Sequence, residues 1–195
     1  MSAVAFDNTM LSILLNPDSN VPCFRGTDAP VDLAKERAES IIVQIQKSRR
    51  KIIIPAPACA ELLTAIGPDA QQYVNLVSRS RVFEIASFDA RCATELAILN
   101  RDTFRQQDQA NGLDTYQKRK VDRQIVAICK VNGVTEIYTD DKGLSARARL
   151  CGITPVAIEE VPVPDSARQG RFELEQHDEI PKVDDGAPAE QPRSG

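Results

Sequence analysis

Short apolar runs alternate with longer stretches in which apolar residues recur every three or four positions. The short runs have apolar residues on both faces, which is typical of buried strands in a parallel sheet. They predict five strands, at 3–7, 51–55, 82–85, 135–139 and 154–158. The longer stretches predict helices at 10–15, 31–49, 58–66, 69–78, 89–106, 121–131 and 143–150. This alternation favours a three-layer α/β/α sandwich with a mostly parallel sheet.

One helix predicted near the middle of the chain carries an acidic residue on its apolar side. Ile125, Val126 and Cys129 form an apolar stripe, and Asp122 precedes Ile125 by one turn. The pattern predicts that the helix begins near Asp122 and that its carboxylate lies at the edge of the core.

The composition changes after residue 160, which suggests a folded domain at 1–160 and a tail at 161–195. From Pro162 onward the sequence is rich in Pro, Asp, Glu and Gln, with eight acidic and four basic residues. Such a segment buries too little apolar surface to fold by itself, so we expect disorder. The net charge of −4 therefore belongs to the tail, and the remaining residues are balanced in charge.

Cysteine and histidine usage excludes several chemistries. The five cysteines include no Cys-x-x-Cys pair, which indicates free and mostly buried thiols in a reducing compartment. The single histidine, His177, lies in the tail, so catalysis by a Ser-His-Asp or Cys-His arrangement lacks its base in the core. No apolar run reaches the roughly 18 residues of a membrane helix, and Asp7 stands too early for a signal peptide. We expect a cytoplasmic protein without a membrane partner.

Five acidic residues are predicted to meet at one edge of the sheet. Asp7 ends the first strand, Glu61 follows the second, Asp122 opens a helix, and Asp140 and Asp141 follow the fourth strand. Ligands of open parallel sheets bind beyond the carboxyl ends of the strands. Clustered carboxylates repel unless a cation neutralises them, and an oxygen-only set favours Mg²⁺ or Mn²⁺. Such an ion can hold a phosphodiester, activate a water molecule and stabilise the leaving oxygen.

Each acid also fits a structural role. Asp7 and the pair Asp140-Asp141 are suited to capping the helices that follow them, Asp122 to a helix dipole, and Glu61 to a solvated helix face.

Basic residues flank Asp122 and are open to two interpretations. They are Lys118, Arg119, Lys120 and Arg123. Beside a metal they would contact phosphate, and otherwise they form a solvated helix face. Arg147 and Arg149, near the last acidic pair, are expected at the surface.

Four segments in order resemble PIN-domain proteins, and most closely the VapC-type toxins of bacterial toxin–antitoxin pairs. They are Phe6-Asp7-Asn8-Thr9, Ile54 to Leu63, Asp122 to Ala127, and Tyr138 to Leu144.

The resemblance implies an endoribonuclease dependent on Mg²⁺ or Mn²⁺. Asp7, Glu61, Asp122 and an aspartate after Thr139 would be the catalytic, metal-holding residues, with Thr9 and Thr139 in support. The last acid is either Asp140 or Asp141, and the spacing from Thr139 favours Asp141. An RNA substrate, an antitoxin partner and a homodimer are likewise implied by resemblance.

Two other functions fit part of this pattern. The Asp7 segment resembles that of haloacid-dehalogenase-like phosphatases, but Thr9 stands where a second acid is required. A non-catalytic PIN-like module that binds RNA or protein is the main alternative, although such a module has no need to gather negative charge beside a phosphate-binding surface.

Overall fold

A computed structural model describes residues 3–16, 19–104 and 116–168. The chain divides into a compact unit, Met1–Pro164, and a second unit, Asp165–Gly195, of which only 165–168 are described. The predicted tail therefore lies mostly outside the described residues, as does His177. The packed unit continues just beyond residue 160, because the Val161 side chain is buried in the core.

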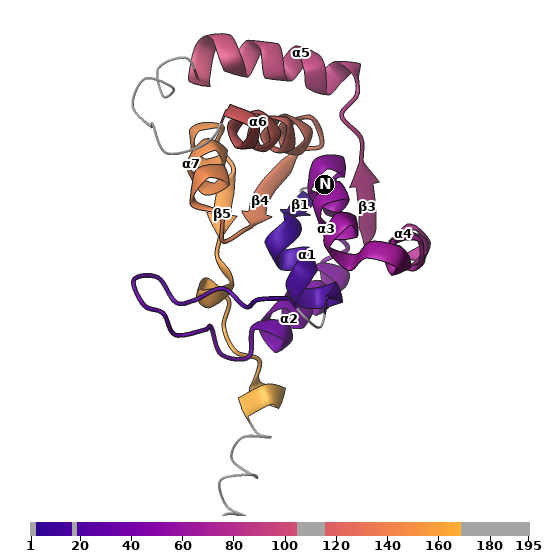
Figure 1. Cartoon of the computed structure of the whole chain (residues 1–195), viewed down its shortest axis with the longest axis vertical. Coiled ribbons are helices and arrows are strands. Elements are labelled where there is room, and N and C mark those ends of the chain that lie inside the picture. The colour runs from indigo at the N-terminus through magenta and orange to yellow at the C-terminus, as the bar shows by residue number, and fades with distance from the viewer. Residues whose placement is uncertain (1–2, 17–18, 105–115, 169–195) are drawn as a thin grey trace, which may run out of the picture. The chain divides into compact units, whose positions relative to one another are not determined.

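Five parallel strands form one sheet, which confirms the predicted α/β class (Figure 1). The strands are β1 (Ala3–Phe6), β2 (Ile52–Pro55), β3 (Phe83–Ala86), β4 (Val134–Tyr138) and β5 (Thr154–Val156). Their order across the sheet is β3-β2-β1-β4-β5. Every pair is parallel, with Val4 opposite Ile52 on one side of β1 and Ala5 opposite Ile137 on the other.

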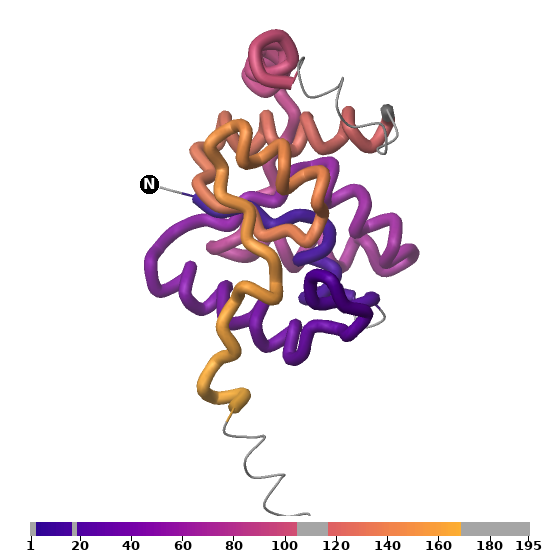
Figure 2. Tube along the Cα trace, turned by 90° about the vertical axis from the view of Figure 1, so that its left-hand side faces the viewer, coloured from indigo at the N-terminus to yellow at the C-terminus, as the bar shows by residue number. Residues whose placement is uncertain are grey.

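Helices cover both faces of the sheet, as Figures 1 and 2 show from two sides. They are α1 (Asn8–Leu15), α2 (Ala34–Lys47), α3 (Ala56–Ile66), α4 (Ala70–Arg79), α5 (Ala90–Leu99), α6 (Tyr116–Val131) and α7 (Lys142–Leu150), with short helices η1 (Gly67–Asp69), η2 (Asn100–Phe104) and η4 (Ile158–Glu160). Because strand side chains alternate between faces, each strand serves two cores. Ala5 and Ile137 pack with α6 and α7, whereas Val4 and Ile52 pack with α1 and α2. Complete burial of Val4, Ile52 and Ile137 contributes about 1.5–3 kcal/mol for each.

Helix α6 differs from its prediction. It extends from Tyr116 to Val131, so it starts well before Asp122. Asp122 therefore lies inside the helix, and its assignment to the helix N-terminus was wrong. The predicted polar loop at 107–117 lies outside the described residues up to 115, and 116–117 are helical. The preceding helix α5 ends at Leu99 and continues as a π-helical turn to Phe104.

The remaining elements match their predictions within a few residues. Helix α2 starts at Ala34, after Leu33 in a left-handed conformation with φ 50°. All five cysteines are free, and Cys59, Cys92 and Cys129 are buried, which confirms the thiol prediction. Among the described helices, none is both long and apolar enough to span a membrane.

Candidate functional site

The acids gather where the winding direction of the sheet changes. Strands β1 and β4 are neighbours in the sheet, with Phe6 opposite Tyr138, although β1 is the first strand in the sequence and β4 is the fourth. Asp7 and Thr139 follow these strands directly. This is the topological switch point, where open α/β sheets leave a crevice for ligands.

Asp7 is the most deeply buried of these acids. Its side chain caps α1 by accepting a hydrogen bond from the Met10 backbone N–H at 3.1 Å, and its second oxygen accepts from the Thr139 hydroxyl. Burial raises the pKa of Asp7 to about 7, although both hydrogen bonds lower it. The charges of Asp140 and Asp141 raise this pKa further. Asp7 therefore caps α1, and in addition its carboxyl group has a pKa close to neutral pH.

Asp141 is fixed by three contacts. It caps α7 through a 2.9 Å hydrogen bond from the Leu144 N–H, and its own N–H donates to the Thr139 hydroxyl at 3.1 Å. Lys118 Nζ lies 2.7 Å from its other oxygen. Burial acts to raise the pKa of Asp141, but the hydrogen bonds from Lys118 and Leu144 outweigh it and hold that pKa below its usual value. Thr139 thus joins Asp7 to Asp141.

Glu61 belongs to the same electrostatic group. It is exposed on α3, yet partial desolvation raises the pKa of its carboxyl group, and the charge of Asp141 adds to this rise. The Lys118 ammonium lowers the same pKa. Asp7, Glu61 and Asp141 therefore form a coupled set with one lysine, and we call these four residues the acidic cluster.

Asp122 forms a buried ion pair that the sequence pattern did not predict. Arg147 Nη1 on α7 lies 2.7 Å from Asp122 Oδ2, and both side chains are only 8% exposed. The expectation that Arg147 lies at the surface was wrong, whereas Arg149 is exposed as expected. A signal was present, because Arg147 lies one turn from Leu144 and next to Ala148, on the apolar side of α7.

The predicted phosphate contacts lie on one helix, α6, but differ in their surroundings. Lys118 faces Asp141, but Arg123 donates to Asn100 Oδ1 at 3.1 Å and lies 5.2 Å from the centre of the Phe104 ring. Arg119 is half-buried and Lys120 is exposed.

Thr9 lies half-buried in the first turn of α1.

Asp140 turns away from Asp141. Its carboxylate oxygens lie 3.4 and 3.5 Å from the Ile158 N–H. Burial raises the pKa of Asp140, the nearby Glu159 carboxylate adds to this, and Arg25 lowers it. The two neighbouring aspartates thus have different hydrogen-bond partners, although the charges of both raise the pKa of Asp7.

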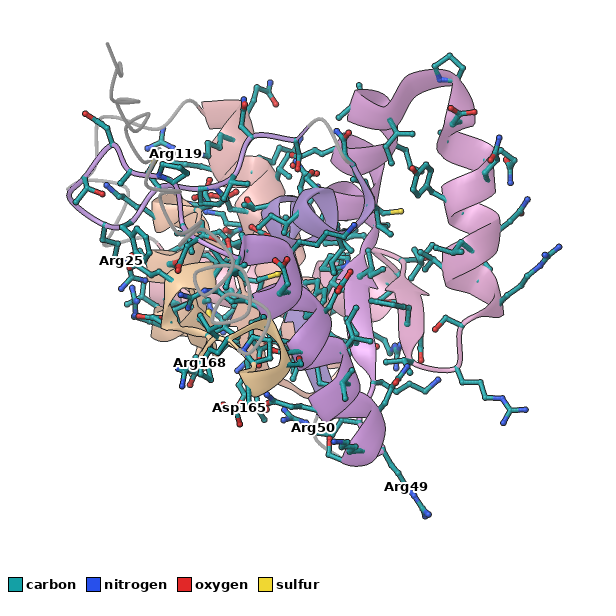
Figure 3. The ribbon with its side chains drawn as sticks, turned by 90° about the horizontal axis from the view of Figure 1, so that it is seen from below. Arg25, Arg49, Arg50, Arg119, Asp165 and Arg168 are labelled. Atoms are coloured by element: carbon teal, nitrogen blue, oxygen red, sulfur yellow. The ribbon has the colours of Figure 1, made fainter. Side chains whose placement is uncertain are left out.

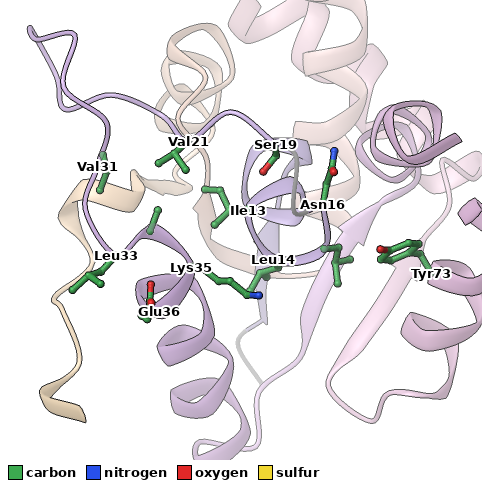
Figure 4. A pocket seen from close by; sticks show the side chains of 12 residues that line it. Ile13, Leu14, Asn16, Ser19, Val21, Val31, Leu33, Lys35, Glu36 and Tyr73 are labelled. Atoms are coloured by element: carbon green, nitrogen blue, oxygen red, sulfur yellow. The ribbon is translucent and has the colours of Figure 1, made fainter. Parts of the chain in front are cut away.

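Two cavities lie near these elements. One of about 510 Å³ lies beside Thr139 and Asp140. The other, about 640 Å³, lies between α1 and the start of α2; Leu33 and Glu36 line it, and no member of the acidic cluster does (Figure 4).

The acidic cluster has the chemistry of a hard-cation site but not a finished geometry. Within the described ranges, no three acidic, cysteine or histidine side chains are placed to hold one metal ion. Oxygen donors from Asp7, Glu61 and Asp141 suit Mg²⁺ or Mn²⁺, and their mutual repulsion favours a cation among them. Lys118 supplies one positive charge there.

Comparison with known proteins identifies similar folds only. No protein-family model matches the chain, nor does any curated protein sequence. Crystal structures with similar chains include VapBC2 from Rickettsia felis bound to a DNA fragment from its promoter, and DNA-bound VapBC from Salmonella typhimurium. The first is 16% identical with a TM-score of 0.49, covering 80% of this chain and 98% of the other. The second is 13% identical with a TM-score of 0.49, covering 81% and 99%. Identities of this size do not transfer an activity or a partner.

Proposed function

We propose that the chain is a metal-dependent endoribonuclease of the PIN type, acting as the toxin of a toxin–antitoxin pair. The observation that supports this most strongly is Asp7, a fully buried carboxyl group at the switch point of the sheet with a pKa of about 7. A helix cap requires no such burial, and perturbed acids in a crevice favour a functional role. RNA as substrate, an antitoxin and a homodimer enter the proposal through the sequence resemblance.

Asp7, Asp141 and Glu61 are the residues proposed to hold Mg²⁺ or Mn²⁺. When bound, such an ion supplies positive charge for the phosphodiester and makes water more acidic. Thr139 orients Asp7, and the Leu144 N–H orients Asp141. The Lys118 ammonium group, now paired with Asp141, is placed to bind a phosphate oxygen of the substrate instead. Asp122 is the fourth predicted metal residue, and its Oδ2 lies 2.7 Å from Arg147 Nη1.

A non-catalytic module that binds RNA or protein is the second candidate. The ion pairs Arg147–Asp122 and Lys118–Asp141 favour it, because each neutralises a carboxylate without any metal. In that case the acids stabilise the fold and no divalent ion is needed.

Cleavage of single-stranded RNA by the purified full chain, with and without Mn²⁺, separates the two candidates. We expect Mn²⁺-dependent cleavage that Asp7→Asn and Asp141→Asn each reduce at least a hundredfold, in line with the loss of a metal ligand. Asp89→Asn is the matched control, since Asp89 also follows a strand and caps a helix but is exposed and pairs with Arg91. RNA binding without cleavage at any Mn²⁺ concentration would establish the binding module instead. A parallel DNA substrate decides between RNA and DNA.

A further inference from the structure

The cavity of about 510 Å³ adjoins the acidic cluster but belongs to different side chains. Thr139 and Asp140 form one wall, and Lys142, Ser145 and Arg149 from α7 form another. Residues 22–27 also line it. Because Thr139 also donates to Asp7, the cavity begins one residue from the proposed reaction centre. Its size suits a small ligand or one nucleotide.

The loop is held in place by ion pairs of Arg25, which Figure 3 labels. Arg25 Nε lies 2.9 Å from Glu159, and Arg25 Nη1 lies 2.9 Å from Glu160. The Arg25 backbone N–H also donates to Glu159 at 2.8 Å. Because two carboxylates neutralise the Arg25 guanidinium, we assign Arg25 to holding the wall of the cavity and not to binding an anion.

Two other cations in the wall have no such partner. Lys142 and Arg149 are both exposed, and in the described part of the chain neither forms an ion pair. They lie seven positions apart on α7, which places them on one side of the helix. Cations exposed in a cavity beside a phosphodiester site are suited to contact phosphate oxygens.

Asp140 gives the cavity a hydrogen-bond acceptor. The buried part of its carboxylate meets the Ile158 N–H at a long 3.4–3.5 Å, which leaves accepting capacity. A carboxylate in a cavity with free cations is unsuited to a bare phosphate but suits a ligand with both phosphate and N–H groups. Nucleobases with exocyclic amino groups offer such donors, and acidic side chains accept from the amino group of cytosine.

We infer that this cavity binds the nucleotide next to the phosphodiester that is cut, with Lys142 and Arg149 on its phosphate and Asp140 on an amino group of its base. This inference rests on the proposed function and adds to it a preference for the neighbouring base. It also gives a role to residues 22–27, between α1 and α2, which line the cavity.

Binding measured without cleavage tests the inference separately from catalysis. Labelled single-stranded RNA hexamers of cytidine or uridine are titrated with the full chain in EDTA, at several salt concentrations. We expect the cytidine hexamer to bind about tenfold more tightly than the uridine hexamer, as one base contact allows. Asp140→Asn should narrow that ratio to about twofold, because an amide both donates and accepts.

The double variant Lys142→Gln/Arg149→Gln tests the phosphate contacts. We expect weaker binding, and a slope of log affinity against log salt that is shallower by about 0.7, the value for one phosphate contact on a single strand. Lys47→Gln/Arg79→Gln is the matched control, since both cations are exposed on α2 and α4, away from the cavity. It should change affinity less than twofold.

Three results would overturn the inference: unchanged affinity and salt slope in the double variant, no binding by the wild-type chain, or tighter binding of free cytidine monophosphate than of the hexamer. The last would indicate a site for free nucleotides. If Mn²⁺-dependent cleavage persists in any of these cases, the proposed function stands and only the cavity assignment fails.

Discussion

Arg147 and Asp122 form a buried ion pair that joins α7 to α6, with 2.7 Å between Nη1 and Oδ2. Removal of one partner leaves an uncompensated charge in the core, whereas replacement of both by apolar groups of similar volume is often tolerated. We therefore expect single and double substitutions of this pair to differ clearly in their free energy of unfolding.

Arg147→Met should lower the free energy of unfolding by about 3–5 kcal/mol, and Arg147→Met/Asp122→Leu should recover most of that loss. Urea unfolding at neutral pH measures both. Arg149→Met, on the same helix but exposed, serves as control and should change stability by less than about 0.5 kcal/mol. Equal losses in Arg147→Met and Arg149→Met would show that the buried pair has no special role.

Asp7 should make stability depend on pH. Its pKa is about 7 in the folded protein and near 3.8 when unfolded, so between these values the folded state retains a proton that the unfolded chain has lost. Stability therefore falls as pH rises through this window, by up to about 4 kcal/mol, and the cost is fully present above pH 7. The Asp7→Asn side chain does not ionise, so the free energy of unfolding of this variant should increase relative to that of wild type from pH 5 to pH 8, as urea unfolding measures.

Asp89 provides a control of opposite sign. The Cys92 backbone N–H, followed by Arg91, lowers the pKa of Asp89 to about 2. The ionised Asp89 carboxylate stabilises the folded state above pH 4, and this stabilisation is lost as pH falls through 2. Asp89→Asn should therefore be slightly less stable than wild type at neutral pH. Parallel pH profiles for wild type and Asp7→Asn would contradict the assignment of Asp7.

Thr139→Val should destabilise the protein by about 1–3 kcal/mol, because the buried Asp7 oxygen loses its hydroxyl donor. The same loss removes a hydrogen bond that lowers the pKa of Asp7, so the pH window of declining stability should extend above 7. Thr154→Val, an exposed change in β5, controls for the substitution itself. A Thr139→Val protein with the wild-type pH profile would exclude the coupling between Thr139 and Asp7.

Lys118→Gln should tighten Mn²⁺ binding about fivefold, because it removes a positive charge that lies 2.7 Å from Asp141. The repulsion between that charge and the ion is about 1 kcal/mol in surroundings like water. Calorimetric titration with Mn²⁺ measures the change. Lys120→Gln, exposed on the same helix, should leave the affinity nearly unchanged. Weaker Mn²⁺ binding by Lys118→Gln would mean that the lysine supports the ion instead of competing with it.

The sequence alone determined the layered fold, because apolar alternation is a local property. Continuous apolar runs such as 52–54 have to be buried on both faces, and only strands between two helical layers allow this. It also determined which acids end strands: Asp7 and Asp141 cap the helices that follow, and capping requires only neighbouring residues.

Only the tertiary structure decided which charges meet. Arg147 and Asp122 are 25 positions apart, and their contact depends on how α6 packs against α7. Asp140 and Asp141 are adjacent in sequence, yet one turns toward η4 and the other toward Lys118, because their partners come from distant elements. The start of α6 at Tyr116 likewise escaped the apolar pattern, since its first turns carry basic residues that stay at the surface. Hydrophobic patterning fixes where elements lie, whereas the partner of a charged side chain is chosen by long-range packing.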